Sequence, residues 1–314
     1  MTFILATVGI VLCRATQTNA QTQTPLHVIV LPFEITAAAY YAQDLRLFSR
    51  AGLDVKIQSL ANGGAVTAAV ISGAADIGSS NPISLEIAYE KGFPVTILAG
   101  AAYQDAKSPT NGLLSVATNS PIHSAKDLNG KTIAVSGLGN TADLGVRNWI
   151  DKNGGDSTTV KLVEVPISTM TAALLAGRVD AAELDASNFD AAPKTRIRLL
   201  ASTFDSLGPR WLQSVWFTSK DFATRHPDVA MKFIAAIREA SAWANAHPRD
   251  AIRVFAKYSK YSLAALAASV RPELATQAVV PAQLQPTIDV ALKYGVLKKG
   301  FPASELINAL NDER

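Results

Sequence analysis

Apolar and polar positions alternate in two different periods along the chain after residue 25. Runs rich in β-branched and aliphatic residues predict strands at 26–31, 53–60, 75–79 and 94–100. The apolar spacing of helices lies between them, at 36–52, 63–73 and 81–92. Gly52 and Gly73 stand where two of these helices should end, since glycine tolerates the left-handed backbone of a helix terminus. Strands separated by short helices indicate βαβ units and a mainly parallel sheet.

The same pattern then starts again in the middle of the chain. Predicted strands lie at 112–118, 131–136, 160–165, 179–184 and 197–202. Helical patterns fall between them, near 141–153, 168–177 and 187–194. The run 211–219 indicates one further strand, and nearly all of the sequence beyond it has helical spacing. The pattern therefore predicts two α/β lobes of similar construction, followed by a helical tail.

A short phrase is repeated in the two predicted lobes. Residues 67–76 and 171–180 share the pattern T-A-A-x-x-x-G-x-x-D, with starting points 104 residues apart. In both copies a small-residue helix ends at glycine, Gly73 or Gly177, and an aspartate opens the next strand, Asp76 or Asp180. Such phrases also recur by chance in α/β proteins. The matching order of the surrounding elements favours equivalent positions in two related lobes.

The first twenty residues differ from the rest of the chain. Phe3 to Leu12 form an apolar run, and the polar stretch that follows contains small residues around Ala20. This pattern is typical of a secretory signal peptide covering residues 1–20, although no basic residue precedes the apolar run. An unstructured tail is the alternative. The only cysteine, Cys13, lies in this segment, so an exported chain would have no disulfide and no cysteine ligand for a metal.

Bulk composition narrows the classes of partner. The chain has 48% hydrophobic and 18% charged residues and a formal net charge of +3, which is ordinary for a globular protein. Lysines and arginines are scattered rather than clustered, which argues against a nucleic-acid partner. No metal site and no cofactor is expected, because no pair of histidines has the spacing of a metal ligand pair.

Polar loops follow the predicted strands where a ligand would bind in an open α/β sheet. They lie at 32–36, 61–65, 79–82, 136–141, 166–169 and 185–188, and they are rich in Gly, Ser, Thr and Asn. Such residues cap helices and present backbone N–H groups, so helix N-termini that converge on one cleft suit a small anionic group. Ser136 and Asp185 belong to these loops.

Several alternatives remain open for the chemistry. Residues 137–142 fit the dinucleotide-binding pattern G-x-G-x-x-A, with Glu164 at the end of the next strand as a ribose-binding acid. The acids Glu34, Glu183 and Asp185 lie near predicted strand ends, where two of them would suit general acid–base catalysis. Arg210 and Trp211 lie where the chain returns to the first lobe, so they are candidate ligand contacts.

The order of motifs resembles one family. The chain contains "YYAQDLRLFSRAGLDVKI", "NGGAVTAAVISGAADIGSSNP", "IHSAKDLNGKTIAVSGLGNTA", "LLAGRVDAAELD" and "FTSKDFATRHPDVAMKFIAAIREASAWANAHP" in this order. Together they resemble the solute-binding proteins of ABC importers of the nitrate/sulfonate/taurine type, whose wider family includes binders of thiamine-pyrimidine precursors. The resemblance implies a type II periplasmic binding fold, in which two lobes close on a ligand.

The resemblance also implies which residues contact the ligand. Carried onto this sequence, they are Phe33, Glu34, Gly63, Gly64, Ala65, Ser80, Asn81, Gly139, Asn140 and Thr141. Where many relatives continue the second repeat into an aromatic–Glu–Pro phrase, this chain has "AELDASNF", which places Asp185 in ligand-facing territory.

We therefore expect an exported receptor that is not an enzyme. Residues 21–112 and 212–314 should form the first lobe and residues 113–211 the second. The receptor should be a periplasmic monomer that binds a small anionic or polar organic solute, such as a sulfonate, a carboxylate or an aromatic acid, and delivers it to a membrane permease. An enzyme on the same fold, either a pyrimidine-precursor synthase or an acid–base lyase, is the alternative.

Overall fold

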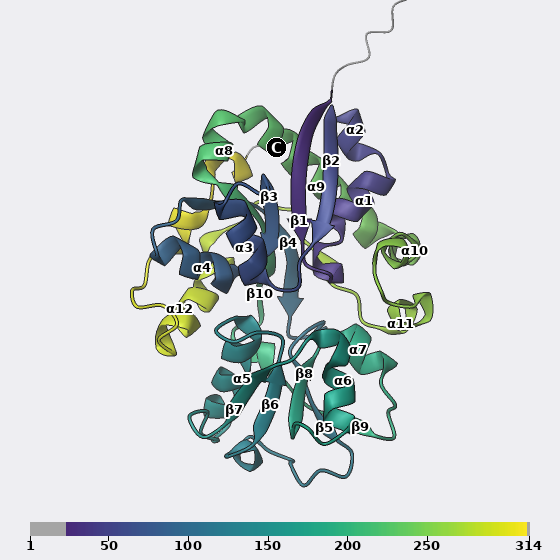
Figure 1. Ribbon diagram of the computed structural model, residues 1–314, viewed down its shortest axis with the longest axis vertical. Helices are drawn as coiled ribbons and strands as arrows, with labels where there is room; N and C mark the ends of the chain where they lie inside the picture. Colours follow the sequence, from purple (N-terminus) through teal and green to yellow (C-terminus); the bar gives the residue numbers. More distant parts are fainter. Residues whose placement is uncertain (1–22, 313–314) are drawn as a thin grey trace, which may run out of the picture.

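The computed structural model describes residues 23–312, which form two sheets in two lobes (Figure 1). The first lobe contains a six-stranded sheet of order β11-β4-β10-β3-β1-β2. The second contains a five-stranded sheet of order β7-β6-β8-β5-β9. The predicted signal peptide and Cys13 lie outside the described residues.

The strands of the first lobe come from three parts of the chain. They are β1 (Thr24–Val30), β2 (Leu53–Ser59), β3 (Ile77–Ser80), β4 (Val95–Asp105), β10 (Arg210–Ser219) and β11 (Glu273–Leu274). The second sheet comes from one continuous part. Its strands are β5 (Leu113–Ala117), β6 (Thr132–Val135), β7 (Lys161–Glu164), β8 (Ala181–Leu184) and β9 (Ile197–Ser202). Strand β10 begins two residues before the predicted lobe boundary at 212.

Helices cover both faces of each sheet. Those of the first lobe are α1 (Ala38–Asp44), α2 (Leu47–Arg50), α3 (Gly63–Ile71), α4 (Pro82–Glu90), α8 (Lys220–Arg225), α9 (Pro227–Ala246), α10 (Pro248–Tyr258), α11 (Leu263–Ala268) and α12 (Gln285–Lys293). The second lobe has α5 (Thr141–Lys152), α6 (Ile167–Leu175) and α7 (Ala186–Ala191). Short 3₁₀ turns are η1 (Glu34–Thr36), η2 (Lys126–Leu128), η3 (Thr203–Ser206), η4 (Pro281–Gln283), η5 (Ala303–Leu306) and η6 (Ala309–Asp312). No helix in the described range is long and apolar enough to span a bilayer.

Two expectations about these elements are wrong. The sheets are mixed rather than mainly parallel, because β10 runs antiparallel to β3 and β4, and β5 runs antiparallel to β8 and β9. These strands adjoin the two crossings between the lobes, so they do not belong to βαβ units. The helix predicted at 36–52 is broken into η1, α1 and α2, with Arg46 in the left-handed region at a φ of 57° between the last two.

The repeated phrase marks equivalent positions, as predicted. In the second sheet the strand order from β9 is β9-β5-β8-β6-β7, and in the first sheet the order from β4 is β4-β10-β3-β1-β2. When the two orders are compared position by position, β8 corresponds to β3 and β6 corresponds to β1. The Asp76 carboxylate accepts from the His27 N–H of β1 at 2.7 Å, and the Asp180 carboxylate accepts from the Thr132 N–H of β6 at 2.8 Å. Gly73 and Gly177 follow the equivalent helices α3 and α6 with φ values of 76° and 66°. The aspartate and glycine shared by the two copies therefore have structural roles.

The core of the first lobe contains a buried acid. Glu86 of α4 is fully buried and bonds to the Thr287 hydroxyl of α12 at 2.6 Å. Burial raises the pKa of Glu86 to about 8, against the opposing effect of the Thr287 hydrogen bond. The ionised carboxylate has no cationic partner among the described residues.

This acid predicts a pH dependence of stability. The folded state holds the Glu86 proton more tightly than the unfolded chain, so stability is greatest below the unfolded pKa and falls as the pH rises from about 4.5 to about 8. The free energy of unfolding of Glu86→Gln should therefore fall less over this pH range. We expect the part of the fall that the variant avoids to be on the order of a few kcal/mol at pH 8. Urea denaturation of both proteins between pH 5 and pH 8.5 measures it. Parallel pH profiles for the two proteins would contradict the prediction.

Candidate functional site

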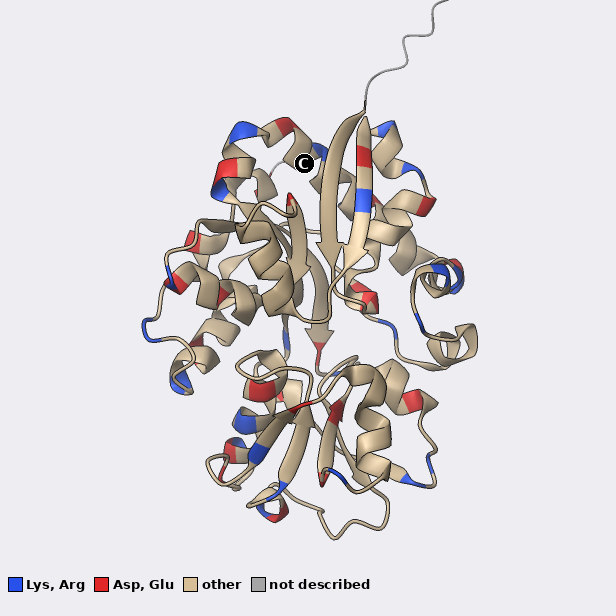
Figure 2. Ribbon diagram, in the orientation of Figure 1, with Lys and Arg blue, Asp and Glu red and all other residues tan. Residues whose placement is uncertain are grey.

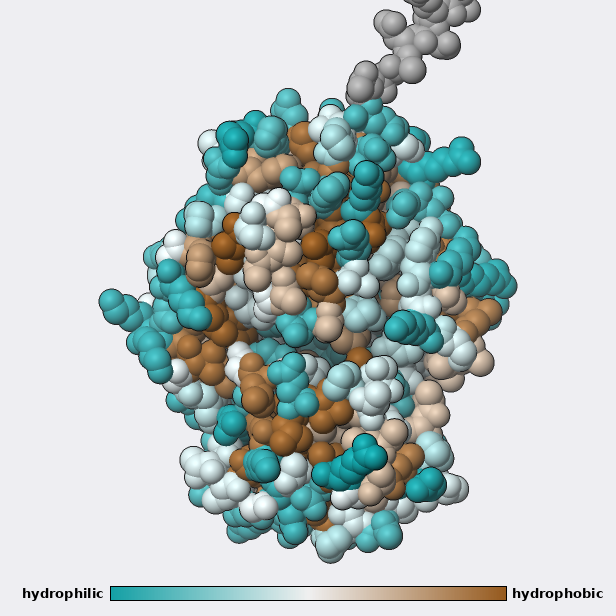
Figure 3. Space-filling model, viewed as in Figure 1, coloured by the Kyte–Doolittle hydropathy of each residue, from teal (hydrophilic) through white to brown (hydrophobic). Residues whose placement is uncertain are grey.

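A cleft between the lobes contains three connected hollows. The central chamber has a volume of about 80 Å³ and is lined by both sheets and their loops. A larger side chamber of about 550 Å³ opens toward α10, and another of about 440 Å³ opens between α3 and the loop before α5. Phe33, Asn62 and Ser136 line both the central and the larger chamber, so these two are continuous. Figure 3 shows the surface hollowed between the lobes, with apolar side chains beside the hollow.

Four helices begin at the cleft, and each is capped by the side chain of its N-cap residue. The carboxamide oxygen of Asn62 accepts from the Ala65 N–H of α3 at 3.0 Å, and that of Asn81 accepts from Ser84 of α4 at 3.1 Å. In the second lobe, Asn140 caps α5 and Asp185 caps α7. Backbone N–H groups and cap side chains thus meet from both lobes.

The structure brings most of the expected residues together. Seven of them line the central chamber: Phe33, Gly63, Asn81, Ser136, Asn140, Thr141 and Asp185. Gly64 and Gly139 line the side chamber beside α3, and Glu34 lines a small recess of about 20 Å³ next to the centre.

Three expected residues do not line these chambers. Ser80 is fully buried and its hydroxyl donates to the Gly63 carbonyl at 3.1 Å, so it lies behind the lining. Ala65 lies one residue deeper in α3 than the lining glycines, and its N–H is taken by Asn62. Trp211 is fully buried behind Phe204, with ring centroids 5.7 Å apart, and Phe204 lines the chamber in its place.

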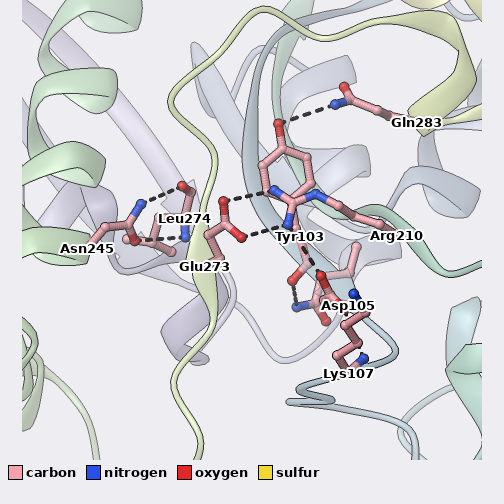
Figure 4. A network of polar contacts seen from close by, with 9 residues as sticks. Tyr103, Asp105, Lys107, Arg210, Asn245, Glu273, Leu274 and Gln283 are labelled. Carbon is pink, nitrogen blue, oxygen red and sulfur yellow. Dashed lines mark hydrogen bonds and ion pairs between the residues drawn. The ribbon is translucent and has the colours of Figure 1, made fainter.

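Arg210 is also not a ligand-charge candidate. Figure 4 shows its guanidinium donating to both oxygens of Glu273, at 2.7 and 2.8 Å. The guanidinium lies 4.1 Å above the Tyr103 ring and also pairs with Asp105 at 3.4 Å. Arg210 therefore joins β10, β4 and β11 at the edge of the first sheet.

Glu34 forms a buried ion pair beside the cleft. Its carboxylate pairs with Arg271, which also reaches the Tyr41 hydroxyl at 3.4 Å. Burial raises the pKa of Glu34 to about 7, while the Arg271 charge opposes the rise. Because Glu34 neutralises Arg271, this arginine adds no net positive charge to the cleft.

Glu183 lies deeper, at the end of β8. It is 4% exposed and lines the central chamber, and one carboxylate oxygen accepts from the Gly112 N–H at 2.9 Å. Burial raises the pKa of Glu183 to about 8, with a smaller contribution from the nearby Asp185. Glu183 was considered in the sequence only as a general acid or base, because a strand end alone does not show which way a side chain faces.

Asp185 connects the two lobes on one side of the cleft. Its carboxylate accepts from the Tyr261 hydroxyl at 2.9 Å and, within α7, from the Asn188 N–H at 2.6 Å. Burial raises the pKa of Asp185, against these hydrogen bonds. The Ser187 and Ser269 hydroxyls, 3.3 Å apart, form a second contact between the same elements.

The other side of the cleft is held as well. The Lys293 ammonium at the end of α12 donates to the Asn148 side chain of α5 at 2.9 Å, and the Tyr294 hydroxyl donates to Asp151 at 2.6 Å. Figure 1 shows α11 and α12 on opposite sides of the first lobe, each facing the second lobe. The cleft is therefore closed by contacts on both sides.

The dinucleotide alternative fits this geometry poorly. Residues 137–142 do open α5 after β6, and Glu164 ends the neighbouring strand β7. However, the Asp143 carboxylate accepts from the Gly139 N–H at 2.8 Å. A carboxylate thus takes a loop N–H that a pyrophosphate would need.

Several lining residues were not expected from the sequence. They are Asn62, Asn111, Ile167, Phe204 and Gln213 in the central chamber, with Lys260 and Tyr261 in the larger side chamber. Asn62 and Ile167 belong to the loops 61–65 and 166–169, which the sequence already indicated as ligand-facing. The others come from crossings between the lobes or from the helical tail, which carry no local mark of a site. No group of three or more metal-ligating side chains occurs within residues 23–312.

Comparison with known proteins agrees with this architecture. A family model described as NMT1/THI5 like matches residues 35–251. The chain belongs to this family. A relative in Brucella abortus (strain 2308), named "Putative binding protein", is 23% identical over 233 residues, which are 74% of this chain and 70% of the relative.

Solved structures show the same fold. The periplasmic aliphatic sulphonate binding protein SsuA from Escherichia coli has a TM-score of 0.74 at 20% identity, covering 90% of this chain and 92% of that chain. The alkanesulfonate-binding SsuA from Xanthomonas axonopodis pv. citri has a TM-score of 0.75 at 18% identity, covering 91% and 98%. The periplasmic nitrate-binding protein NrtA from Synechocystis PCC 6803 has a TM-score of 0.64 at 15% identity, covering 77% and 69%. The expected periplasmic binding protein fold and the expected family are confirmed.

Proposed function

We propose that this chain is the periplasmic solute-binding receptor of an ABC importer. It captures a small polar organic solute between its lobes and delivers it to a membrane permease. The observation that carries the proposal is a chamber lined from both lobes, with helix N-termini on both sides and contacts that close it. The fold of periplasmic receptors and the signal-like residues 1–20 support export, and we propose a monomer divided at the lobe boundaries given above.

Lobe movement tests the proposal directly. The chain has no cysteine after residue 13, so single cysteines at Lys56 and Lys126, which are exposed on different lobes, accept a pair of fluorophores. A bound solute should raise energy transfer between them, because closure shortens the distance between the lobes. A solute that binds tightly without changing the transfer would contradict a closing receptor.

An enzyme is the second candidate, because Glu183 and Asp185 are buried acids in the same chamber. Raised pKa values are typical of catalytic acids. Both groups, however, accept hydrogen bonds that hold structural elements together, from Gly112 and from α7. Mass spectrometry of a bound solute after prolonged incubation distinguishes the two functions. An unchanged solute supports the receptor, and a product identifies an enzyme.

Tyr261 supplies a variant that removes one hydrogen bond between the lobes. We expect Tyr261→Phe to weaken solute binding about tenfold, because the closed state loses the hydroxyl that donates to buried Asp185. Calorimetric titration of a solute found in the closure assay measures the loss. Tyr258→Phe is the matched control, since the Tyr258 ring stacks on Tyr40 and its hydroxyl has no hydrogen-bond partner among the described residues. Equal affinities for the two variants would contradict a role of the Asp185–Tyr261 bond.

A further inference from the structure

The charged groups that line the central chamber are all acidic. Glu183 and Asp185 are the charged side chains on its described wall, and no lysine or arginine lines it. The nearest basic lining residues are Lys260 and Lys91, each in a different side chamber. Figure 2 shows acidic segments on both lobes near their boundary, and most lysines and arginines farther out. An anion in this chamber would face two carboxyl groups without a counter-charge.

One oxygen in this chamber lacks a partner. The Gly112 N–H occupies one oxygen of Glu183, and no described residue donates to the other. The side chain is more than nine-tenths buried and lines the chamber, so its second oxygen is the one available to a ligand there. A donor on a bound solute would complete the hydrogen bonding of this carboxyl group.

The neighbouring polar groups are already engaged. Both oxygens of Asp185 accept hydrogen bonds, from Asn188 and from Tyr261. Gln213 donates to the Tyr103 carbonyl and the Thr110 hydroxyl, and its oxygen accepts from Asn111. Among the two carboxyl groups of this wall, Glu183 therefore holds the free oxygen, and Asp185 adds negative potential beside it.

We propose that the solute carries a cationic nitrogen, as in a primary amine or an amidine, which donates to the free oxygen of Glu183. This inference rests on the proposed receptor function and departs from the anionic solute that the helix N-termini suggested. The chamber of about 80 Å³ admits only a small head group, and the larger chamber beside it takes the rest of the solute. The carboxamide nitrogen of Asn62, which has no described partner, and the hydroxyl of Ser136 line both chambers and suit polar groups of the solute.

The protonation of Glu183 predicts the direction in which affinity changes with pH. Because the pKa of Glu183 is raised to about 8 in this structure, the group is mostly protonated at neutral pH. A cation stabilises its carboxylate, so the proton of Glu183 leaves to solvent when the cation binds. Affinity should then rise with pH between about 6 and 8, and one proton should be released. An anion would favour the protonated acid, so its affinity would fall over the same range. Asp185 is the charged group that acts on Glu183, and it accepts from the Tyr261 hydroxyl. Glu34 and Arg271 pair with each other beside the cleft.

Matched probes of opposite charge test the proposal on the intact chain. We would titrate benzamidine against benzoate, and ethanolamine against glycolate, by calorimetry in two buffers that differ in ionisation enthalpy. Cations should bind at least tenfold more tightly than their paired anions and release a proton. Glu183→Gln should weaken cation binding by about 10- to 100-fold, because a hydrogen bond to a charged group is lost. The glutamine oxygen still accepts from Gly112, so the variant should keep its fold.

Glu86→Gln is the matched control, since Glu86 is a buried acid with a similarly raised pKa that lies outside the cleft. It should leave cation affinity and its pH slope unchanged. Tighter binding of the anions, proton uptake with the cations, or unchanged cation affinity in Glu183→Gln would each overturn the inference. If anions bind and raise the energy transfer between the lobes, the receptor function stands and only the inference fails. If neither class binds at millimolar concentration, the inference also fails, and a lobe-closure screen of a wider solute set decides the receptor function. If Glu183→Gln does not fold, the proton count of the unchanged chain decides alone.

Discussion

Gly63→Ala is expected to abolish tight solute binding. A Cβ atom at this position would lie 2.4 Å from the Asn81 side-chain nitrogen and 2.4 Å from the Ser80 hydroxyl. Real Cβ atoms do not approach so closely, and Ser80 is fully buried, so it has no solvent to move into. The alanine must therefore displace Asn81, which caps α4 and meets Thr141 of the other lobe at 3.4 Å.

The expected loss combines several effects. Overpacking costs about 1–3 kcal/mol and a damaged cap about 0.5–2 kcal/mol, and the displaced Asn81 also distorts the chamber wall. We expect at least a hundredfold loss of affinity for a solute identified in the lobe-closure assay, measured by calorimetry, and a lower melting temperature.

Gly64→Ala is the control, at the adjacent residue of the same helix. Its Cβ would meet only the Asn62 side-chain oxygen, at 3.5 Å, which is an ordinary contact. Helix propensity favours this alanine by about 1 kcal/mol, so stability should be kept or increased. Equal affinity in the Gly63→Ala and Gly64→Ala variants would show that the close approach of α3 to Asn81 does not shape the site.

Trp211→Ala is expected to lower the free energy of unfolding by about 3–5 kcal/mol and to affect the chamber wall only through Phe204. The Trp211 ring of β10 is fully buried in the core, and it supports Phe204 from behind. The alanine would leave a large cavity there. Urea denaturation followed by circular dichroism measures the change.

Phe33→Ala provides the contrast, because Phe33 is half-buried and lines the central chamber, the larger side chamber and the small recess. It should lower solute affinity with a smaller effect on stability. If Trp211→Ala instead lowered affinity with a change of less than about 1 kcal/mol in stability, Trp211 would be a ligand contact, as the sequence suggested.

The buried acids explain why stability and binding should respond to pH together. Glu86 lies in the core of the first lobe, and Glu183 lies in the chamber, yet burial raises the pKa of each to about 8. The Glu86→Gln and Glu183→Gln variants separate the two effects. The first should alter the pH dependence of folding alone, and the second should alter the pH dependence of binding.

Local sequence determined much of the architecture. Strand and helix periods, glycine stops and cap residues act over a few neighbouring positions, so they are readable without the fold. The repeat at 67–76 and 171–180 identified equivalent elements of two lobes, and the caps Asn81 and Asn140 lie at the cleft as expected. The family resemblance was also readable, because its motifs are continuous in the chain.

The tertiary structure alone decided the role of each residue where the chain crosses between the lobes. Arg210 and Trp211 are adjacent, yet one pairs with Glu273 at a sheet edge and the other fills the core. β10 is buried along nearly its whole length, so no alternation of polar and apolar residues could show which side chains reach the cleft. Glu183 and Tyr261 acquire their roles from contacts with residues 71 and 76 positions away in sequence, at Gly112 and Asp185. Sequence fixes short-range geometry, whereas the charge of the chamber arises from long-range packing that brings acids together and pairs the nearby arginine elsewhere.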